Sequence, residues 1–305
     1  MSTKRPESPL HGILLIDKPS GWTSHDVVAR ARRITGQRRI GHTGTLDPMA
    51  TGLLVLCLGN ATRLVEYITG HDKRYSGEIA LGVTTTTADA EGEPTATRPV
   101  PPLDEATLRA IEQRFSGDLQ QAPPAFSAIK VDGRRAYDLA RQGELSELPP
   151  RPVRIHSLRL TTIAPGRLSI EVHCGAGTYV RSLARDIGEV IGCGGHLAAL
   201  RRHSAGPFSL ATAITLEQLQ EYAGGGELPG LLIPPDEGIV AHPAAIVAAD
   251  GARRFRTGLM HRGENVREAP AAAARVYSAD GDFLGVADVS DSGEIRPAKV
   301  FAASN

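Results

Sequence analysis

Short apolar runs, each bounded by turn residues, set the strongest limit on the fold of this chain. The first is GILLID at residues 12–17, which is followed by the turn-forming sequence KPSG. A second run, LLVLCLG at residues 53–59, follows a loop rich in Gly and Thr. Apolar runs of this length that end at Gly or Pro are typical of buried strands. We therefore expect a buried strand at each place.

Helical segments alternate with the predicted strands. Helical spacing of the apolar residues from Val27 to Ile34 predicts a helix that begins with Ser24 as its N-cap. Further along, two strands are expected around residues 152–163 and 168–174, before a helix at residues 179–191. This mixture of helices and hairpin-linked strands favours an α+β fold with a central, mainly antiparallel sheet flanked by helices.

The character of the chain changes after Phe208. The stretches GGGELPG and IPPDEG are rich in Gly and Pro, which indicates a domain boundary. Beyond them, RVYSADGDFLGVADV contains two alternating strands around Asp280-Gly281, a strong hairpin signal. We therefore expect a main domain at residues 11–230 and a small C-terminal β domain at residues 235–305.

Length and missing motifs restrict the class of protein. The 305 residues have room for about two domains. No apolar run approaches the roughly 20 residues of a membrane span, and the N-terminus has no apolar signal region, so a cytoplasmic protein without membrane contact is expected. Motifs of ATP-binding loops, dinucleotide-binding loops and zinc deaminases are absent. No cofactor is therefore expected. Residues 84–102 are polar and Pro-rich, which predicts an exposed loop.

The three cysteines, Cys57, Cys174 and Cys193, are odd in number and far apart. This spacing argues against a disulfide framework and fits a reducing compartment. A zinc set of His173, Cys174, Cys193 and His196 is conceivable, because Cys193 and His196 are spaced like finger ligands. The adjacent pair His173 and Cys174 would point to opposite faces of a strand, however. Buried thiols without a metal are the favoured interpretation.

Charge is distributed unevenly although the formal net charge is zero. Lys and Arg outnumber Asp and Glu by 11 to 6 in residues 1–75 and by 12 to 7 in residues 125–210. Acidic residues lead by 8 to 3 in residues 76–124 and by 13 to 8 in residues 211–305. The two basic blocks could fold into one positive face suited to a phosphate backbone, although scattered surface charge could also produce such blocks.

The loop GHTGTLDP at residues 41–48 is the most informative stretch for chemistry. Gly41 and Gly44 allow the backbone to approach a ligand closely, and Pro48 restricts Asp47 to extended geometry. A carboxylate displayed in this way can act as a nucleophile or a base. Taken alone, an Asp before a Pro in a Thr-rich loop is more often a turn residue.

Two tyrosines lie in basic, Gly-flanked motifs. Tyr179 and Arg181 in GTYVRSLARDIG lie near a predicted helix start, where an anion would be favoured. Tyr75 in KRYSG follows two cations and could stack on a base. The plainer alternatives are a solvated arginine, a partly buried tyrosine and a strand tyrosine in the core.

Taken together, these stretches resemble the TruB family of pseudouridine synthases, the bacterial enzymes that act on uridine 55 of tRNA. The matching segments are GILLIDKPSGWTSHDVV, RRIGHTGTLDPMATGLLVLCLGNATRL, DKRYSGEIALGVTTTTADAEG, APPAFSAIKVDGRRAYDLAR and GTYVRSLARDIGEVIGCGGHLAALRRHSAGPF. They occur in family order and cover roughly residues 11–210. The resemblance implies the pseudouridine-synthase fold. A looser match, through GDFLGVADVSDSGEIRPAKVF, implies a PUA-like RNA-binding domain at the C-terminus.

The resemblance also implies site residues. Asp47 corresponds to the catalytic aspartate and Arg181 to the arginine that pairs with it. Tyr179 would lie against the base near C5. Among the substrate-binding residues, Tyr75 would stack on the flipped uracil, His42 would help hold the T-loop, Leu200 would line the pocket and Lys18 would support the active-site region.

The implied reaction is an isomerisation of uridine 55 in the T-loop of tRNA. It is redox-neutral, and it needs one carboxylate, one proton acceptor and a stacking platform. The base must be flipped out to be reached. We expect a monomer that uses the tRNA T-arm as its partner and needs no guide RNA or protein partner. The alternatives are a non-catalytic tRNA-binding protein, a guide-dependent synthase and an RNA methyltransferase.

Overall fold

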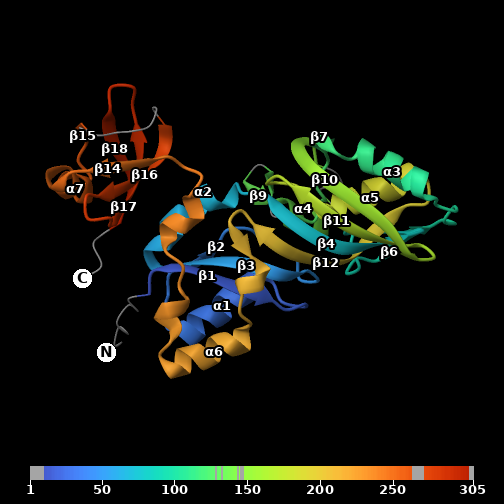
Figure 1. The fold of residues 1–305 in the computed structure, drawn as a ribbon. Coiled ribbons are helices and arrows are strands. Elements are labelled where there is room, and N and C mark those ends of the chain that lie inside the picture. Colours follow the sequence, from blue (N-terminus) through green and yellow to red (C-terminus); the bar gives the residue numbers. More distant parts are fainter. Residues whose placement is uncertain are drawn as a thin grey trace.

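The computed structural model describes residues 10–127, 129–131, 133–142, 144, 148–262 and 271–301. Figure 1 shows a larger body, built on one long sheet with helices along its sides, and a smaller β unit that the last part of the chain forms. No helix within these ranges is long and apolar enough to cross a membrane.

Nine strands of the described residues form the sheet of the larger body. The main path runs in spatial order through β1 (Gly12–Lys18), β3 (Thr51–Leu58), β12 (Gly195–Ala205), β4 (Lys73–Leu81), β11 (Arg167–Cys174), β10 (Arg151–Ala164) and β7 (Gly117–Gln121). Two short strands join its sides, β2 (Ile40–His42) on β3 and β13 (Phe208–Ser209) on β12. Every pairing is antiparallel except that of β12 with β3. The predicted central, mainly antiparallel sheet is confirmed.

Helices flank this sheet. The α-helices of the larger body are α1 (Ser24–Thr35), α2 (Val65–Thr69), α3 (Glu105–Arg114), α4 (Ala136–Arg141), α5 (Val180–Ile191) and α6 (Leu216–Gly225). Four 3-10 turns, η1 (Gly59–Leu64), η2 (Leu210–Thr212), η3 (Leu228–Leu231) and η4 (Pro235–Ile239), connect them to other elements. A Cβ on Gly188 would lie 2.3 Å from the backbone nitrogen of Gly195, so glycine is what lets α5 pack closely on β12.

The helix α1 begins one residue earlier than its predicted cap implies. Thr23, not Ser24, is the N-cap, because Thr23 is still extended and accepts a hydrogen bond from the backbone nitrogen of Asp26. The Asp26 carboxylate in turn accepts from the backbone nitrogen of Thr23, which completes a capping box. Ser24 is buried and helical, and its hydroxyl donates to the carbonyl of Leu46 and accepts from the Leu46 nitrogen. Ser24 thereby anchors the Gly/Thr-rich loop to α1.

Residues 84–102 do not form the exposed loop expected from their polarity. They contain a hairpin of β5 (Val83–Thr85) and β6 (Pro94–Thr97), and the turn region between these strands reaches β12. The nitrogen of Ala90 donates to the carbonyl of Leu197, and the nitrogen of Leu197 donates to the carbonyl of Ala88. These backbone bonds bury the side chain of Asp89, which is 3% exposed. A second small hairpin joins β8 (Lys130–Val131) to β9 (Arg134–Arg135).

The register of β1 and β3 positions the loop that contains Asp47. Lys18 lies opposite Gly52, so the last residue of β1 is beside the end of the loop that enters β3. The apolar side chains of both strands are buried in the core on either face of the sheet. The predicted buried strands at residues 12–17 and 53–59 are confirmed, and they form a rigid base for the loop.

The C-terminal unit has its own sheet. Its strands follow the order β14 (Ala244–Val247), β16 (Ala271–Ser278), β17 (Phe283–Val289), β18 (Glu294–Val300) and β15 (His261–Arg262), with α7 (Ala249–Arg256) packed against them. The hairpin predicted around Asp280-Gly281 is the connection between β16 and β17, and Gly281 there has φ 91°.

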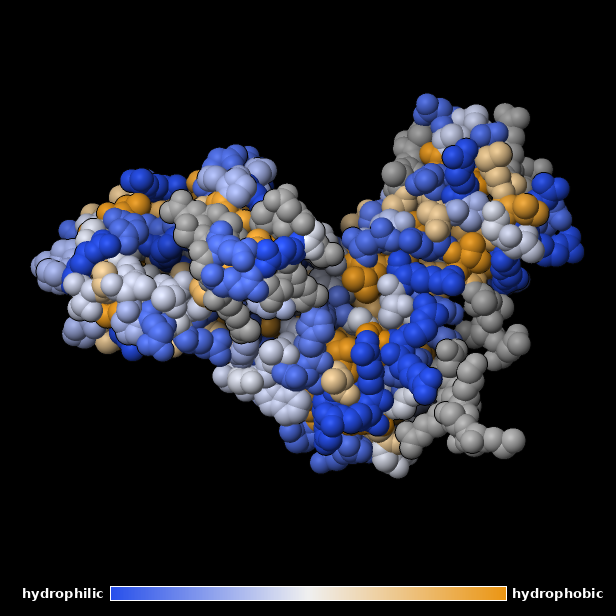
Figure 2. Space-filling view, turned by 180° about the vertical axis from the view of Figure 1, so that it is seen from behind, coloured by the Kyte–Doolittle hydropathy of each residue, from blue (hydrophilic) through white to orange (hydrophobic). Residues whose placement is uncertain are grey.

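This unit contacts the larger body around η1 and α2. Lys299 lies 2.6 Å from the carboxylate of Glu66, and Arg63 donates to the carbonyl of Val300. Phe301 packs in the same apolar cluster as Ile13, and Figure 2 shows apolar side chains gathered where the two parts meet. The expected boundary between residues 230 and 235 stays a prediction.

Candidate active site

The guanidinium of Arg181 lies between two carboxylates. Its Nε is 2.9 Å from Oδ2 of Asp47, and its Nη2 donates to Oδ1 of the same carboxylate at 3.1 Å. Its Nη1 is 3.2 Å from Oδ2 of Asp89. The Arg181 side chain is only 6% exposed, whereas that of Asp47 is 32% exposed. Asp47 is therefore the member of this group that a ligand can reach.

Backbone carbonyls fix the same guanidinium further. Nη1 donates to the carbonyl of Thr87 at 3.0 Å, and Nη2 donates to the carbonyl of Phe126 at 3.1 Å. Arg181 thus joins the Asp47 loop, the turn after β5 and the segment after β7 from its position in the first turn of α5. Because an arginine has several donors in a rigid plane, these contacts define its orientation closely.

Opposing effects act on the ionisation of Asp47. Burial raises the pKa of this carboxyl above its usual range, and the charge of Asp89 adds to the rise. The charges of Arg181 and Lys18 act in the opposite direction. The ion pair with Arg181 is therefore the larger of the two charge effects that favour the carboxylate form in a site where burial disfavours charge.

Lys18 holds the backbone on either side of this loop. Its ammonium donates to the carbonyls of Pro19 at 2.9 Å, Trp22 at 2.6 Å and Pro48 at 3.1 Å. The Lys18 side chain is fully buried, and burial lowers its pKa to about 8. All three ammonium donors are satisfied by these carbonyls. Because Pro48 follows Asp47 directly, the lysine fixes the position of the carboxylate.

Arg202 supports the loop from β12. It is 2% exposed, its Nε donates to the carbonyl of Leu53 at 2.7 Å, and its Nη2 donates to the carbonyl of Gly44 at 3.0 Å. A Cβ on Gly52 would lie 2.4 Å from the carbonyl oxygen of Arg202, and the φ of +96° at Gly52 also favours glycine. The close approach of β3 to β12 therefore depends on glycine at position 52.

Tyr75 lies on β4, opposite Arg202 in the register of β4 and β12. It is half-buried and packs against the main apolar core. Burial raises the pKa of its phenol, which the charge of Arg202 opposes and that of Asp47 reinforces. Tyr75 is therefore a neutral aromatic side chain within electrostatic range of Asp47.

Tyr179 is the N-cap of α5, two residues before Arg181. The side-chain amide of Gln121 holds its backbone on both sides: the Tyr179 nitrogen donates to Oε1 at 2.8 Å, and Nε2 donates to the Tyr179 carbonyl at 3.1 Å. Burial raises the pKa of the Tyr179 phenol, and the charge of Asp47 adds to this. The two tyrosines and Lys18 thus share the surroundings of Asp47.

His42 and Leu200 lie at the margin of this group. His42 ends β2, and burial, with the charges of His25 and Arg202, lowers its pKa to about 4. Its Nδ1 has no hydrogen-bond partner among the described residues. Leu200 is buried on β12 opposite Gly77 and belongs to the main core cluster. Neither side chain forms a hydrogen bond or an ion pair with Asp47 in the described part of the chain.

Three residues of this arrangement were not expected from the sequence: Asp89, Arg202 and Gln121. Asp89 and Arg202 lie in the family-like segments TTTTADAEG and HLAALRRHSAG, so the signal was a charged residue inside a matching segment. Gln121 precedes Pro-rich residues and has no such signal. Only tertiary pairing shows that these side chains are buried and that they contact Arg181, the Asp47 loop and Tyr179.

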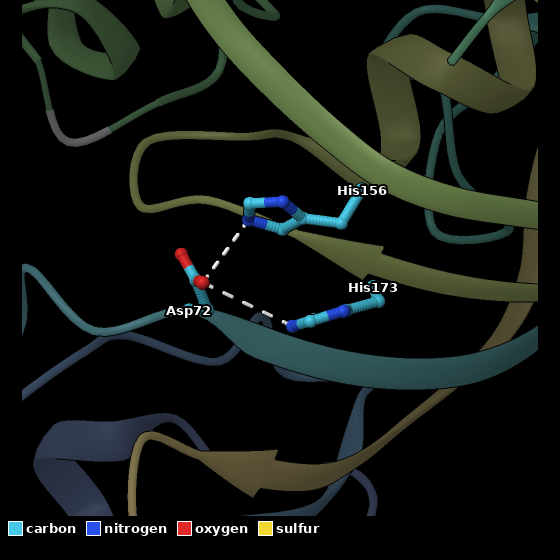
Figure 3. A group of neighbouring side chains, drawn as sticks. All are labelled: Asp72, His156 and His173. Carbon is cyan, nitrogen blue, oxygen red and sulfur yellow. Dashed lines mark ion pairs between the residues drawn. The ribbon is translucent and has the colours of Figure 1, made fainter. Parts of the chain in front are cut away.

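The zinc set considered from the sequence is not brought together. Cys174 and Cys193 are buried free thiols, and burial raises the pKa of Cys174 to about 11. Nδ1 of His196 lies 2.9 Å from the carbonyl of Val83. His173 instead lies beside Asp72 and His156 (Figure 3).

Family comparisons cover nearly the whole chain. Residues 32–180 match the model described as TruB family pseudouridylate synthase (N terminal domain). Residues 181–239 match a tRNA pseudouridylate synthase B C-terminal domain, and residues 243–301 match pseudouridine synthase II TruB, C-terminal.

Curated relatives are similar along their full length. A tRNA pseudouridine synthase B of Xanthomonas campestris pv. campestris (strain 8004) is 45% identical over 298 residues, which cover 97% of this chain and 96% of the relative. The protein of the same name from Arthrobacter sp. (strain FB24) is 43% identical, and the match covers 97% of this chain and 98% of the relative.

Solved structures share the fold at lower identity. The archaeal box H/ACA sRNP Nop10–Cbf5 complex contains a chain with a TM-score of 0.74 and 23% identity, covering 98% of this chain and 88% of that one. A chain of a Cbf5–Nop10–Gar1 complex has a TM-score of 0.75 and 24% identity, covering 97% of this chain and 86% of that one. At this identity the likeness shows the fold alone.

Proposed function

Since this chain belongs to the TruB family of pseudouridylate synthases, we propose that it isomerises uridine 55 in the T-loop of tRNA to pseudouridine. Pseudouridine synthases are isomerases, and the expected fold, with its central sheet and C-terminal β domain, is confirmed. Support for tRNA as substrate comes from the relatives named tRNA pseudouridine synthase B, which match 97% of this chain.

The reaction breaks the N1–C1′ bond of uridine, rotates the base and joins C5 to C1′. A proton then leaves C5 and N1 gains one, so atoms and electrons balance without an oxidant or an energy donor. Asp47 supplies the negatively charged oxygen that starts this sequence, as a nucleophile at the base or at C1′ or as a base at C2′. Its partial exposure beside the buried guanidinium of Arg181 is the single observation that carries the proposal.

Arg181 keeps the carboxylate ionised and oriented in this mechanism. The ion pair opposes the effect of burial, which raises the pKa of Asp47. Asp89 holds the other end of the guanidinium, and Lys18 holds the backbone next to Asp47. The catalytic oxygen thus meets the substrate in a preorganised position, which lowers the reorganisation needed in the transition state.

Aromatic and apolar side chains receive the base after it flips out of the T-loop. Tyr75 stacks on the uracil, and Tyr179 lies against the base near C5. Leu200 lines the pocket beside Gly77. His42, with a free Nδ1 in the described structure, helps hold the T-loop while its target base is extruded.

Binding of the T-arm relies on the two basic blocks and on the C-terminal domain, which we propose to be PUA-like. Arginines of the first block lie on the outer face of α1 and just beyond it, where they can reach phosphates. The protein is proposed to act as a cytoplasmic monomer, without a guide RNA or a protein partner.

The direct test is incubation of the purified protein alone with an unmodified tRNA transcript, followed by carbodiimide treatment and primer extension. A stop at position 55 of the T-loop is the expected result. A stop that requires an added guide RNA would favour a guide-dependent synthase, a possibility raised by the shared fold of the Cbf5 complexes. No stop anywhere would reject the proposed activity.

A further inference from the structure

Outside the candidate active site, two histidines and an aspartate meet on the sheet (Figure 3). Asp72 immediately precedes β4, His156 lies on β10 and His173 on β11. Nε2 of His156 is 3.0 Å from Oδ2 of Asp72, and Nε2 of His173 is 3.9 Å from the same oxygen. The two imidazole rings are 4.5 Å apart between centroids, with an angle of 38° between their planes.

A β-bulge brings the two rings to one face. The pairing of β10 with β11 slips between Ile155 and Ser157, so His156 is the extra residue of the bulge. On the neighbouring strand, Val172 and Cys174 are buried in the core cluster that includes α5. Since side chains alternate along a strand, His173 points to the opposite face, where His156 also lies.

The donor set matches the chemistry of a borderline metal ion. The candidate ligand atoms of the three residues all lie within 4.8 Å of one another. A bound zinc ion needs them somewhat closer, because zinc–nitrogen and zinc–oxygen distances are about 2.0–2.2 Å. Partly exposed side chains at strand positions reach such distances through small rotations about their side-chain torsions.

We propose that Asp72, His156 and His173 bind one zinc-class divalent ion through two imidazole nitrogens and one carboxylate oxygen. The side chains of His156 and His173 are 29% and 25% exposed, and that of Asp72 is 50% exposed. The ion would therefore keep at least one open position for water or an exchangeable ligand.

The charges around the three residues determine how tightly they are expected to bind a divalent ion. Arg74 faces His173 across the pairing of β4 with β11, and Lys73 adjoins Asp72. Both cations oppose a divalent ion. We therefore expect binding weaker than that of a closed four-ligand zinc site.

The ion would join three strands that are far apart in the sequence. An ion that binds the folded chain but not the unfolded chain raises the free energy of unfolding. The rise grows with the logarithm of the free ion concentration divided by the dissociation constant. Zinc should therefore raise the melting temperature of the full-length protein, and a chelator should reverse the rise. This readout is independent of the proposed function, so a failure of one does not affect the other.

The test is isothermal titration of zinc chloride into untagged, chelator-treated full-length protein. One equivalent should bind, and His156→Ala and His173→Ala should each weaken binding by about tenfold or more. His203→Ala is the matched control, because His203 lies on β12 and contacts Ser76 instead. Cobalt binding, followed by visible absorption, gives a spectroscopic readout of nitrogen and oxygen ligation.

Two results would overturn the proposal: the absence of saturable binding by the wild-type protein, and equal binding by the wild-type protein and His173→Ala. Asp72→Asn distinguishes loss of a ligand from loss of fold, since the amide preserves the size of the side chain. Circular dichroism of each variant must match that of the wild-type protein without metal. Weakened zinc binding in both histidine variants, with wild-type zinc binding in His203→Ala, would establish the site.

Discussion

Oδ2 of Asp89 lies 3.2 Å from Nη1 of Arg181, the guanidinium nitrogen that does not contact Asp47. Asp89 is 3% exposed, so this contact is shielded from water. The same carboxylate accepts hydrogen bonds from the hydroxyl of Thr87 and the nitrogen of Glu91. Asp89 therefore fixes Arg181 from the side opposite the catalytic candidate.

Replacing Asp89 with Asn should reduce turnover without abolishing it. The amide can still accept from Thr87, but the charge that orients Arg181 is lost. We expect kcat to fall by about tenfold, which corresponds to about 1.4 kcal/mol in the barrier. Unfolding free energy should fall by about 1–3 kcal/mol, because a buried charged hydrogen bond is weakened. Single-turnover kinetics and urea unfolding measure the two effects, and an unchanged kcat would assign Asp89 to stability alone.

Tyr75→Leu should retain the fold and tRNA binding but lose much of its turnover. Stacking on a flipped base is worth about 1–3 kcal/mol, and a leucine cannot supply it. Tyr75→Phe is the control, because it preserves the aromatic face and removes only the hydroxyl. If the leucine variant turns over tRNA as fast as the phenylalanine variant, Tyr75 acts as a core residue and not as a stacking platform.

His42 should make the folded protein sensitive to mild acid. Its pKa is lowered to about 4 in the fold, below the ordinary value of 6.5. Between these values the unfolded chain binds more protons than the folded one, so unfolding free energy falls as pH falls through this window. Above pH 6.5 the contribution is fully present.

The measurement compares urea unfolding of the wild-type protein and His42→Gln. When the pH falls from about 7 to about 5, the free energy of unfolding of the wild-type protein should decrease by about 1–2 kcal/mol more than that of the variant. Other groups titrate in both proteins and cancel in the difference. Parallel losses in the two proteins would mean that His42 is not held neutral by its surroundings.

Much of the fold follows from local pattern, whereas the surroundings of Asp47 depend on tertiary pairing. The strands at residues 12–17 and 53–59 and the hairpin at Asp280-Gly281 are set by apolar runs and turn residues. The buried position of Asp89 could not be predicted from the sequence, because a polar, Pro-rich stretch normally forms an exposed loop. Its burial arises from backbone bonds to Leu197, more than a hundred residues later, which no local pattern encodes.

Arg38 and Arg39 should contribute to tRNA binding through phosphate contacts. Both are exposed and lie between α1 and β2, the strand that leads into the loop that holds Asp47. Each phosphate contact releases counterions, so the logarithm of the binding constant should fall steeply with the logarithm of salt concentration. Replacing both with Gln should flatten this slope by about two contacts. Filter binding at several salt concentrations gives the slope, and an unchanged slope would place the RNA elsewhere.

Asp47→Asn should abolish isomerisation while preserving tRNA binding. The amide keeps the shape of the side chain but removes the negative charge and the reactive oxygen. Affinity arises mainly from phosphate and stacking contacts, which this change leaves intact. Arg181 keeps its contacts with Asp89 and two backbone carbonyls, so the fold should survive. Release of tritium from 5-tritiated uridine in tRNA measures turnover, and filter binding of the same tRNA measures affinity.

The matched control for this change is Asp118→Asn. Asp118 also pairs with an arginine, at 3.1 Å, but its side chain is 77% exposed and lies on β7 away from the loop. An exposed pair of this kind contributes about 0–1 kcal/mol, so the control should remain fully active. If Asp47→Asn releases tritium at a rate near that of the control, the charge on Asp47 is not needed for the reaction. The proton acceptor and the nucleophile would then have to be sought among the other groups around Arg181.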